Sequence, residues 1–303
     1  MKKSILFLLL TGFVFSYINA QEATESYPVT TFESNYIVDD QTTTVFDKKT
    51  LGFAIQHKFG TIDNGISDLL GIYGAAGNIR LGLDYVPMKN LQIGAGITKS
   101  NMATDLNAKY SLIKQTSDNK VPVSVAVYGV LSIDGRDVDA FETGKVRYPD
   151  ENNPQHTYPS HDITFTDRWS YFSQVMVSRK FGEFLAIQGA ASFTHYNMVK
   201  ETGDHDLIGL HGLAKIKISP QSSLTFNYNA PLKIQSLSEQ TEVPDYQPTI
   251  ALGWQISTYT HAFQIYVSNA PGMLPMDNMM NNRTKFDKEG IAVGFTITRL
   301  WAF

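Results

Sequence analysis

Twelve stretches in which apolar residues alternate with polar or small ones follow one another along the chain, and they constrain the fold more than any other feature. An alternation with a period of two is typical of a β-strand that has one apolar face. After residue 80 no segment shows a long helical period. The stretches are 51–59, 79–85, 91–97, 106–112, 121–131, 169–177, 185–193, 208–218, 224–228, 250–256, 263–267 and 291–303.

The connections between these stretches fall into two classes of length. Short ones occupy residues 87–90, 115–120, 182–184, 219–222 and 258–261. Those at the opposite ends are long, at 60–78, 134–168, 198–206, 231–247 and 270–289, with 99–105 as a short exception. Barrels of the outer membrane have short periplasmic turns and longer outer loops, whereas a soluble sandwich has no reason to sort its loops.

These features predict one all-β domain at residues 51–303, a single antiparallel transmembrane β-barrel of about twelve strands. An even count places both ends of the barrel on the periplasmic side, and closure leaves no strand edge exposed to lipid. Counts of ten or fourteen stay open, because the pattern in Thr30–Phe46 is weak.

The N-terminus carries the features of an export signal. Lys2 and Lys3 precede the apolar run Ile5–Tyr17, and Ala20 offers a cleavage point, so residues 1–20 are predicted to be a signal peptide. A buried N-terminal helix is the alternative. Residues 21–50 are then a periplasmic N-terminal segment, either a flexible tail or a plug of the lumen. Ile66–Tyr73 is a second plug candidate, as a short helix folded into the lumen.

The last stretch ends on an aromatic residue. Phe295, Ile297, Trp301 and Phe303 share the apolar face, which Arg299 interrupts. This end is similar to the C-terminal signal by which outer-membrane barrels are recognised, so the barrel-assembly machinery is an expected partner. An ordinary amphipathic last strand is the alternative.

Three segments carry a family resemblance: IQHKFG at Ile55–Gly60, ALGWQISTYTHAFQIYVSN at Ala251–Asn269, and GFTITR at Gly294–Arg299. Together they resemble an uncharacterised family of Bacteroidota outer-membrane β-barrel proteins, a porin-like domain of unknown function. The resemblance covers about residues 28–303, and Lys58 stands where arginine is expected. It implies an outer-membrane location and a barrel, and it implies no activity.

Composition excludes several function classes. The chain has no cysteine, so disulfides, thiolate metal sites and cysteine nucleophiles are absent. The net charge of −4 becomes 23 − 29 = −6 without Lys2 and Lys3, which gives no basic footprint for nucleic acid. No cofactor and no metal site are expected. The acidic loop 134–168 lacks the spacing of a calcium loop, and the methionines at 273, 276, 279 and 280 fit apolar packing better than copper binding.

Parity predicts which charged side chains line the lumen. These lumen-lining candidates are Lys58, Arg80, Asp84, Lys109, His211, Lys215 and Lys217. Five of them are always basic and one is acidic, a balance that favours anions if the lumen is open. The predicted function is therefore a porin-like channel for a small polar solute, with an anion as one option. The alternative is a non-conducting barrel that acts as a scaffold or partner for periplasmic or surface proteins.

One residue pair bears on an enzymatic function. Ser173 and His195 share the outward face of neighbouring stretches, as in barrel phospholipases, with Tyr171 expected opposite His195 and Ser173 on the diagonal. No Asn or Asp on that face is expected to orient the histidine, which a serine nucleophile requires. The sequence therefore predicts no enzyme.

Overall fold

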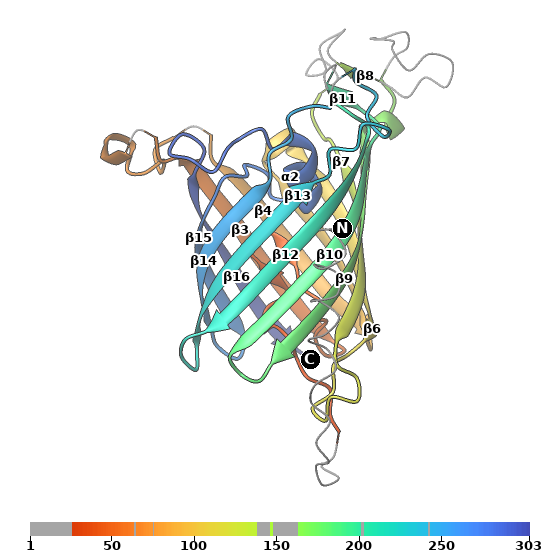
Figure 1. Cartoon of the computed structure of the whole chain (residues 1–303), viewed down its shortest axis with the longest axis vertical. Coiled ribbons are helices and arrows are strands. Elements are labelled where there is room, and N and C mark those ends of the chain that lie inside the picture. The colour runs from red at the N-terminus through yellow and green to blue at the C-terminus, as the bar shows by residue number, and fades with distance from the viewer. Residues whose placement is uncertain are drawn as a thin grey trace, which may run out of the picture.

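Twelve strands of the computed structural model form one closed antiparallel barrel, in which each strand pairs with its neighbours along the chain and β16 closes on β3 (Figure 1). The structure describes residues 26–63, 65–74, 76–137, 146–147, 163–200, 203–241 and 243–303. The wall strands are β3 (Thr50–Thr61), β4 (Asn78–Met88), β5 (Leu91–Thr98), β6 (Thr104–Ile113), β7 (Ser124–Ile133), β9 (Trp169–Phe181), β10 (Leu185–Tyr196), β12 (Asp206–Lys217), β13 (Ser222–Pro231), β14 (Thr249–Ser257), β15 (His261–Ser268) and β16 (Ala292–Ala302).

Smaller elements lie inside the barrel or in its loops. Two short strand pairs are β1 (Tyr36–Ile37) with β2 (Asp40–Gln41), and β8 (Val146–Arg147) with β11 (Val199–Lys200). The helical pieces are η1 (Gly65–Asp68), η2 (Ser100–Met102), η4 (Thr166–Arg168) and α2 (Pro275–Asn281). Among the described residues, no helix has both the length and the apolar character needed to cross a membrane.

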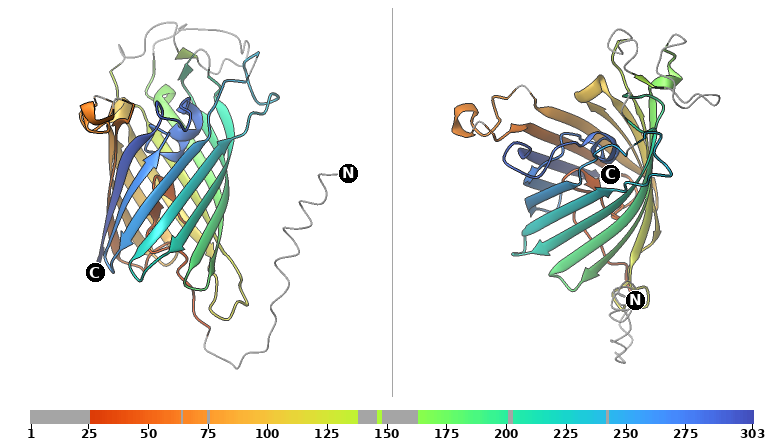
Figure 2. Two further views of the ribbon diagram at one scale, coloured as in Figure 1. Left: turned by 60° about the vertical axis from the view of Figure 1, so that its left-hand side comes forward. Right: turned by 45° about the horizontal axis from the view of Figure 1, so that its top comes forward.

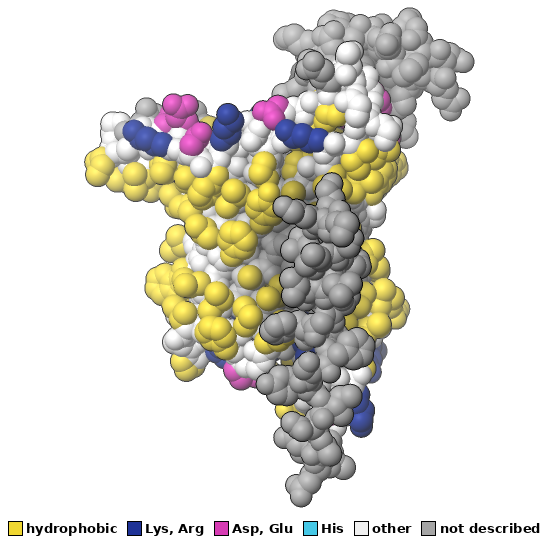
Figure 3. All heavy atoms as spheres, viewed as in Figure 1, with side chains coloured by type: hydrophobic (Ala, Val, Ile, Leu, Met, Phe, Trp, Pro, Cys, Tyr) yellow, Lys and Arg dark blue, Asp and Glu magenta, His cyan; other side chains and the backbone are white. Residues whose placement is uncertain are grey.

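The alternation in the sequence becomes the two faces of the wall. In β3 the buried residues at even positions alternate with partly exposed ones at odd positions. Outward residues such as Leu83, Leu252 and Ile265 keep about half of their surface exposed, and the space-filling view shows a broad hydrophobic band across the face of the barrel that it presents (Figure 3). A band of this kind belongs in lipid, so the predicted barrel and its orientation of faces are confirmed.

The two ends of the barrel differ as the connection lengths predict. Tight turns connect the strands at one end of the barrel, and long loops connect them at the other (Figures 1 and 2). The β6–β7 connection is longer than expected, because β7 begins only at Ser124. Within this connection the Thr116 N–H donates a hydrogen bond to the Val121 carbonyl. Short turns mark the periplasmic end, which also receives the start of β3 and the end of β16.

A segment before the first wall strand folds up into the barrel from the periplasmic end. We call residues 31–44, which contain β1 and β2, the hairpin. Phe32, Ile37 and Val38 pack against inward residues of the wall, including Leu213 and Tyr266. Val38 lies at the tip with a positive φ of 56°, which is strained for a β-branched residue. Side chains of β15 and β16 hold it there, since Gln264 accepts from the Val38 N–H and Thr296 donates to its carbonyl.

A second segment enters the barrel from the outer end. We call residues 269–291, which contain α2, the outer plug, and Figure 2 shows the helix at the mouth of the barrel. Met276 packs on inward Tyr128 and Phe172, while Met279 packs on Leu207. All four methionines of this loop are buried, so they serve apolar packing as the composition suggests.

The helix expected to enter the lumen does not do so. Ile66–Tyr73 projects sideways from the outer end of β3 and β4, away from the lumen (Figure 1). Ile66 and Tyr73 are 85% and 76% exposed. A run of apolar residues does not by itself specify which surface covers it, so the sequence pattern could not place this segment.

Candidate functional site

The lumen is the candidate site, and all the side chains predicted to line it lie on its face. Six of them are almost fully buried, namely Lys58, Arg80, Asp84, Lys109, His211 and Lys215. Lys217 shares their face at the periplasmic end, keeps 29% of its side chain exposed and lies 3.9 Å from the Glu183 carboxylate. Among the described residues these groups do not border an open bore, because the hairpin and the outer plug occupy the space between them.

Lys58 joins the two inserted segments to the wall. Its ammonium group pairs with the Asp39 carboxylate at the tip of the hairpin. The same nitrogen donates to the carbonyl oxygens of Ala270 and Gly272 in the outer plug, at 2.8 and 2.6 Å. Lys58 and Asp39 are 2% and 4% exposed. One wall cation therefore contacts both inserted segments at the point where they meet.

Arg80 forms the most complete ion pair of the wall. Its Nε and Nη2 donate to the two oxygens of Asp105 at 2.8 and 2.6 Å, and Nη1 donates to Gln56 at 3.0 Å. A Cβ added at Gly96 would lie 2.4 Å from Nη2 of Arg80, so glycine makes room for the guanidinium. Bidentate pairs of this kind are the strong ones.

Asp105 was missing from the predicted lining. The pattern suggested a strand that began at Leu106, whereas β6 begins at Thr104, and Asp105 shares the inward parity of Asn107 and Lys109. The lumen is accordingly less basic than predicted. The hairpin adds further carboxylates, because Asp40 accepts hydrogen bonds from Asn227 and Asn229 at 2.9 and 2.7 Å.

The remaining lining candidates bond mainly to the hairpin. Asn35 donates to the Asp84 carboxylate at 2.9 Å. Lys109 donates to the Gln41 side chain at 2.8 Å and to the Thr42 carbonyl at 3.0 Å, and Lys215 pairs with Glu33. His211 instead bonds to Ser192 on the neighbouring strand, at 2.7 Å. Polar groups of the hairpin thus satisfy much of the charge on the wall.

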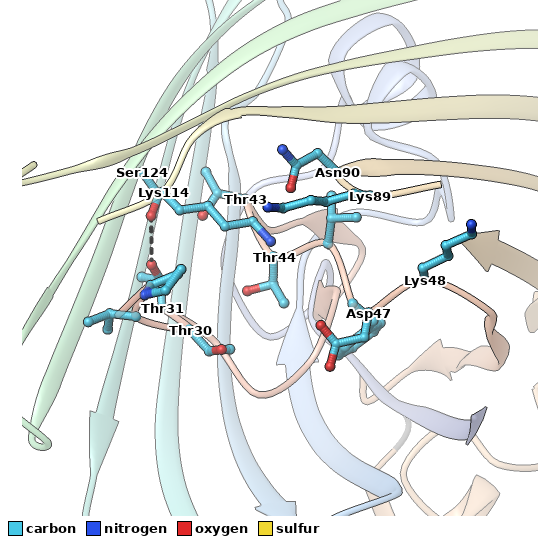
Figure 4. A pocket seen from close by; sticks show the side chains of 14 residues that line it. Thr30, Thr31, Thr43, Thr44, Asp47, Lys48, Lys89, Asn90, Lys114 and Ser124 are labelled. Carbon is cyan, nitrogen blue, oxygen red and sulfur yellow. Dashed lines mark hydrogen bonds between the residues drawn. The ribbon is translucent and has the colours of Figure 1, made fainter. Parts of the chain in front are cut away.

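A cavity of about 540 Å³, which we call the vestibule, lies between the base of the hairpin and the periplasmic rim. Threonine hydroxyls of residues 30, 31, 43 and 44 line one side (Figure 4). Lys89 and Lys114 come from turns of the wall, and Figure 4 shows their amines turned toward the same space, whereas Lys48 points away. Burial lowers the pKa of Lys114; nearby Asp47 raises it and Lys89 lowers it again.

The amino-acid sequence from residue 32 to residue 301 matches the family described as "Membrane bound beta barrel domain (DUF5777)". The chain belongs to this family. No curated protein is similar in sequence to it. The family carries no assigned activity, and its description agrees with the closed barrel and the lipid-facing band described above. The protein is an outer-membrane β-barrel.

Several solved structures resemble the barrel in outline. The COG4313 outer membrane channel from Pseudomonas putida F1 has 11% identity and a TM-score of 0.44, with 85% of this chain and 97% of that chain covered. The KdgM porin has 8% identity and a TM-score of 0.42, with 84% and 99% covered. The Ralstonia pickettii toluene transporter TbuX has 9% and 0.40, with 85% and 90% covered. Likeness this distant carries no information about a solute.

His195, the candidate catalytic histidine, has partners that the sequence did not predict. Its place opposite Tyr171, with Ser173 on the diagonal, agrees with the register. His195 Nδ1 bonds to Asp206 at 2.7 Å and Nε2 bonds to Asn197 at 2.9 Å. The expectation of no Asp or Asn partner was therefore wrong. Asp206, the first residue of β12, lies opposite His195 on the neighbouring strand, and Asn197 directly follows the end of β10. Both ring nitrogens are engaged, so neither is left to deprotonate Ser173.

The acidic outer loop falls mostly outside the described residues, as does the predicted signal peptide at residues 1–20. Of its carboxylates within them, Asp134 pairs with Arg136 at 2.6 Å. In the described ranges, no three His, Asp or Glu side chains are grouped as a metal ion requires.

The outer plug carries one titratable group with a shifted pKa. Burial raises the pKa of Asp277 to about 6, Asp105 and Asp134 raise it too, and the hydrogen bond from Tyr196 at 2.6 Å acts the other way, as does Lys58. The protonated form of Asp277 favours the state in which the outer plug is seated in the barrel, because the pKa is higher in that state than in the released one. The plug is therefore held less strongly as the pH rises from about 4 to about 6, and its stability in the barrel is constant above that.

We therefore expect the outer plug to open more often at pH 7.5 than at pH 4.5, by roughly thirtyfold, because pH 4.5 already lies inside the window between the ordinary pKa of an aspartate and the raised pKa of about 6. Hydrogen–deuterium exchange of residues 270–281, corrected for the intrinsic effect of pH, measures this opening. Asp277→Asn should exchange equally at both pH values. A pH dependence that persists in Asp277→Asn contradicts this assignment.

Proposed function

We propose that the protein is a gated channel for a small polar solute, closed at rest by the hairpin from the periplasmic side and by the outer plug from the other. The observation that carries the proposal is that the wall is complete without either segment. The twelve wall strands pair with one another in a closed ladder, and neither the hairpin nor the outer plug contributes a strand to it. The hairpin is held to them by side-chain contacts, so it can withdraw without opening a sheet edge to lipid.

The polar chemistry of the lumen supports the idea that the hairpin and the outer plug can leave it. Buried ion pairs and amides stabilise a closed interior less than apolar packing of similar volume does. Here the interface is largely polar, and several of its groups have no protein partner among the described residues, such as both side-chain polar atoms of Gln92 and Oε1 of Gln174. Such groups are suited to water or to a hydrated solute.

The charge of the emptied lumen supports an anionic solute. When the hairpin leaves, Glu33, Asp39 and Asp40 leave with it. The buried charges that remain on the wall are then four basic against two acidic, namely Lys58, Arg80, Lys109 and Lys215 against Asp84 and Asp105. Lys89 and Lys114 at the vestibule extend this positive surface toward the periplasm.

Planar-bilayer recordings test the proposal on four proteins: the wild type, a deletion of residues 31–44, a replacement of residues 271–284 by a four-residue turn, and the combination. We expect the wild type to be closed, the single variants to open briefly, and the combined variant to conduct steadily with anion preference in a salt gradient. Heat-modifiable migration in gels verifies that each barrel has folded.

The alternative function is a non-conducting scaffold for envelope proteins, and the double plugging of the lumen is the observation that favours it. A folded combined variant that remains silent overturns the channel and supports this alternative.

We further infer that the last strand carries the assembly signal. Phe295, Ile297 and Trp301 lie on the outward parity of β16, and Phe303 follows the strand with 77% exposure. The Arg299 guanidinium, which interrupts the apolar face, lies 4.8 Å from the centre of the Trp301 ring. That contact, and the position of Arg299 near the rim of the barrel, reduce the free-energy cost of placing its charge in lipid.

A further inference from the structure

The loop that projects from the outer end of β3 and β4 exposes an unusual amount of apolar surface. We call the described residues of this loop, 62–63, 65–74 and 76–77, the overhang. Within eight residues, Ile66, Leu69, Leu70, Ile72 and Tyr73 are each at least 44% exposed. Contiguous apolar surface on this scale marks an interaction site rather than an ordinary loop.

Backbone contacts hold the overhang in a fixed position against the wall. The Gly60 N–H donates to the Gly71 carbonyl at 2.9 Å, and Gly71 has a φ of +86°. A Cβ at Gly71 would lie 2.1 Å from the Gly60 oxygen, so only glycine permits this approach. Asp68 accepts from the Gly71 N–H at 2.9 Å, and Lys99 donates to the Gly77 carbonyl at 2.7 Å.

A notch of about 220 Å³ lies between the overhang and the wall, with room for roughly seven water-sized groups. Its wall side is aromatic, since His57 lies 4.5 Å from Phe59 and stacks at 5.2 Å on Phe295. Ile72 of the overhang forms the opposite side, and Lys99 lies at the rim. His57 Nδ1 is buried and has no partner within the described part of the chain.

The overhang continues the surface that the barrel presents to lipid. Figure 3 shows hydrophobic side chains along its lower side, joined to the band on the wall, and charged side chains along its upper side. The barrel exposes that band to acyl chains of the membrane, so acyl chains also reach the underside of the overhang. Continuity with the lipid-facing band identifies the occupant as lipid, not as a second protein.

We propose that the overhang and the adjoining wall of β3 and β4 form a binding site for a phosphate-bearing lipid of the outer leaflet. Ile66 and Tyr73 insert among the acyl chains, and one chain segment fills the notch between Phe59 and Ile72. The lipid phosphate accepts hydrogen bonds from the exposed Lys99 ammonium. The neighbouring His57 Nδ1 gains a polar partner in the same headgroup region.

Membrane insertion is tested with a single-cysteine reporter, because the chain has no native cysteine. Ile66→Cys, labelled with an environment-sensitive fluorophore, is reconstituted in phosphatidylcholine vesicles containing phosphatidylglycerol and spin-labelled lipid. We expect blue-shifted emission and strong quenching. Ser236→Cys, on an exposed outer loop, is the matched control and should be quenched little. Equal quenching of the two labels overturns the proposal.

The notch itself is tested by lipid retention. Native mass spectrometry of the whole purified protein, titrated with phosphatidylglycerol, should show one lipid retained at low lipid concentration. Ile72→Asp and Lys99→Gln should each weaken retention at least tenfold, while Lys120→Gln, an 85% exposed lysine at the periplasmic end, should not. Unchanged retention in Ile72→Asp overturns the site. Dimers that persist while retention is absent overturn it too, in favour of an interface between copies.

Discussion

Replacement of Lys58 by methionine is expected to release both inserted segments at once. Lys58 pairs with Asp39 of the hairpin and donates to two carbonyl groups of the outer plug. Removal of one member of a buried ion pair leaves the other charge without compensation, at a cost of about 3–5 kcal/mol. Because about 1.4 kcal/mol is a tenfold change in population, the open states should become roughly a hundredfold or more abundant.

Thiol labelling at two single-cysteine positions measures the release. Ser34→Cys reports on the hairpin and Met280→Cys on the outer plug, since both side chains are at most 5% exposed. In the Lys58→Met background both positions should label much faster. Lys215→Met is the matched control, because its partner Glu33 belongs to the hairpin alone and only position 34 should respond. Labelling at position 280 that is unaffected by Lys58→Met contradicts the bridging role.

The barrel was predictable because side-chain parity is fixed by a local rule. Successive residues of a strand face opposite sides, so placing a strand also places each of its side chains. For this reason Lys58, Arg80 and Lys109 were assigned to the lumen from sequence alone. Asp105 was missed because strand boundaries are the least certain part of such a prediction, and an error of two residues at the start of β6 removed it.

The contents of the lumen were not predictable by the same rule. The hairpin pairs with itself over only two residue pairs, and its other partners are side chains of wall strands far along the sequence. Val38, for example, bonds to Gln264 and Thr296. Such contacts leave no period in the sequence. The outer plug was recognised only as an apolar loop, because its attachment to Lys58 uses backbone carbonyls, which every residue carries.

Replacement of Asp105 by asparagine is the second change for which we expect a large effect, here on the wall itself. Arg80 is 1% exposed and its guanidinium would lose both charged hydrogen bonds, so the free energy of unfolding should fall by about 3–5 kcal/mol. Urea titration in lipid vesicles measures the loss. Asp245→Asn, which breaks the exposed pair with Lys233, should cost less than about 1 kcal/mol.

The double variant Arg80→Met with Asp105→Leu distinguishes the effect of the two charges from the effect of the volume that the two side chains fill. An apolar pair removes the uncompensated charge, so this variant should recover most of the stability that Asp105→Asn loses. Gly82 and Gly96 surround the guanidinium, and they leave room for the unbranched methionine chain. If the loss of stability in the double variant equals the sum of the losses in Arg80→Met and Asp105→Leu measured singly, the two side chains are not coupled, and the ion pair is not what shapes this part of the wall.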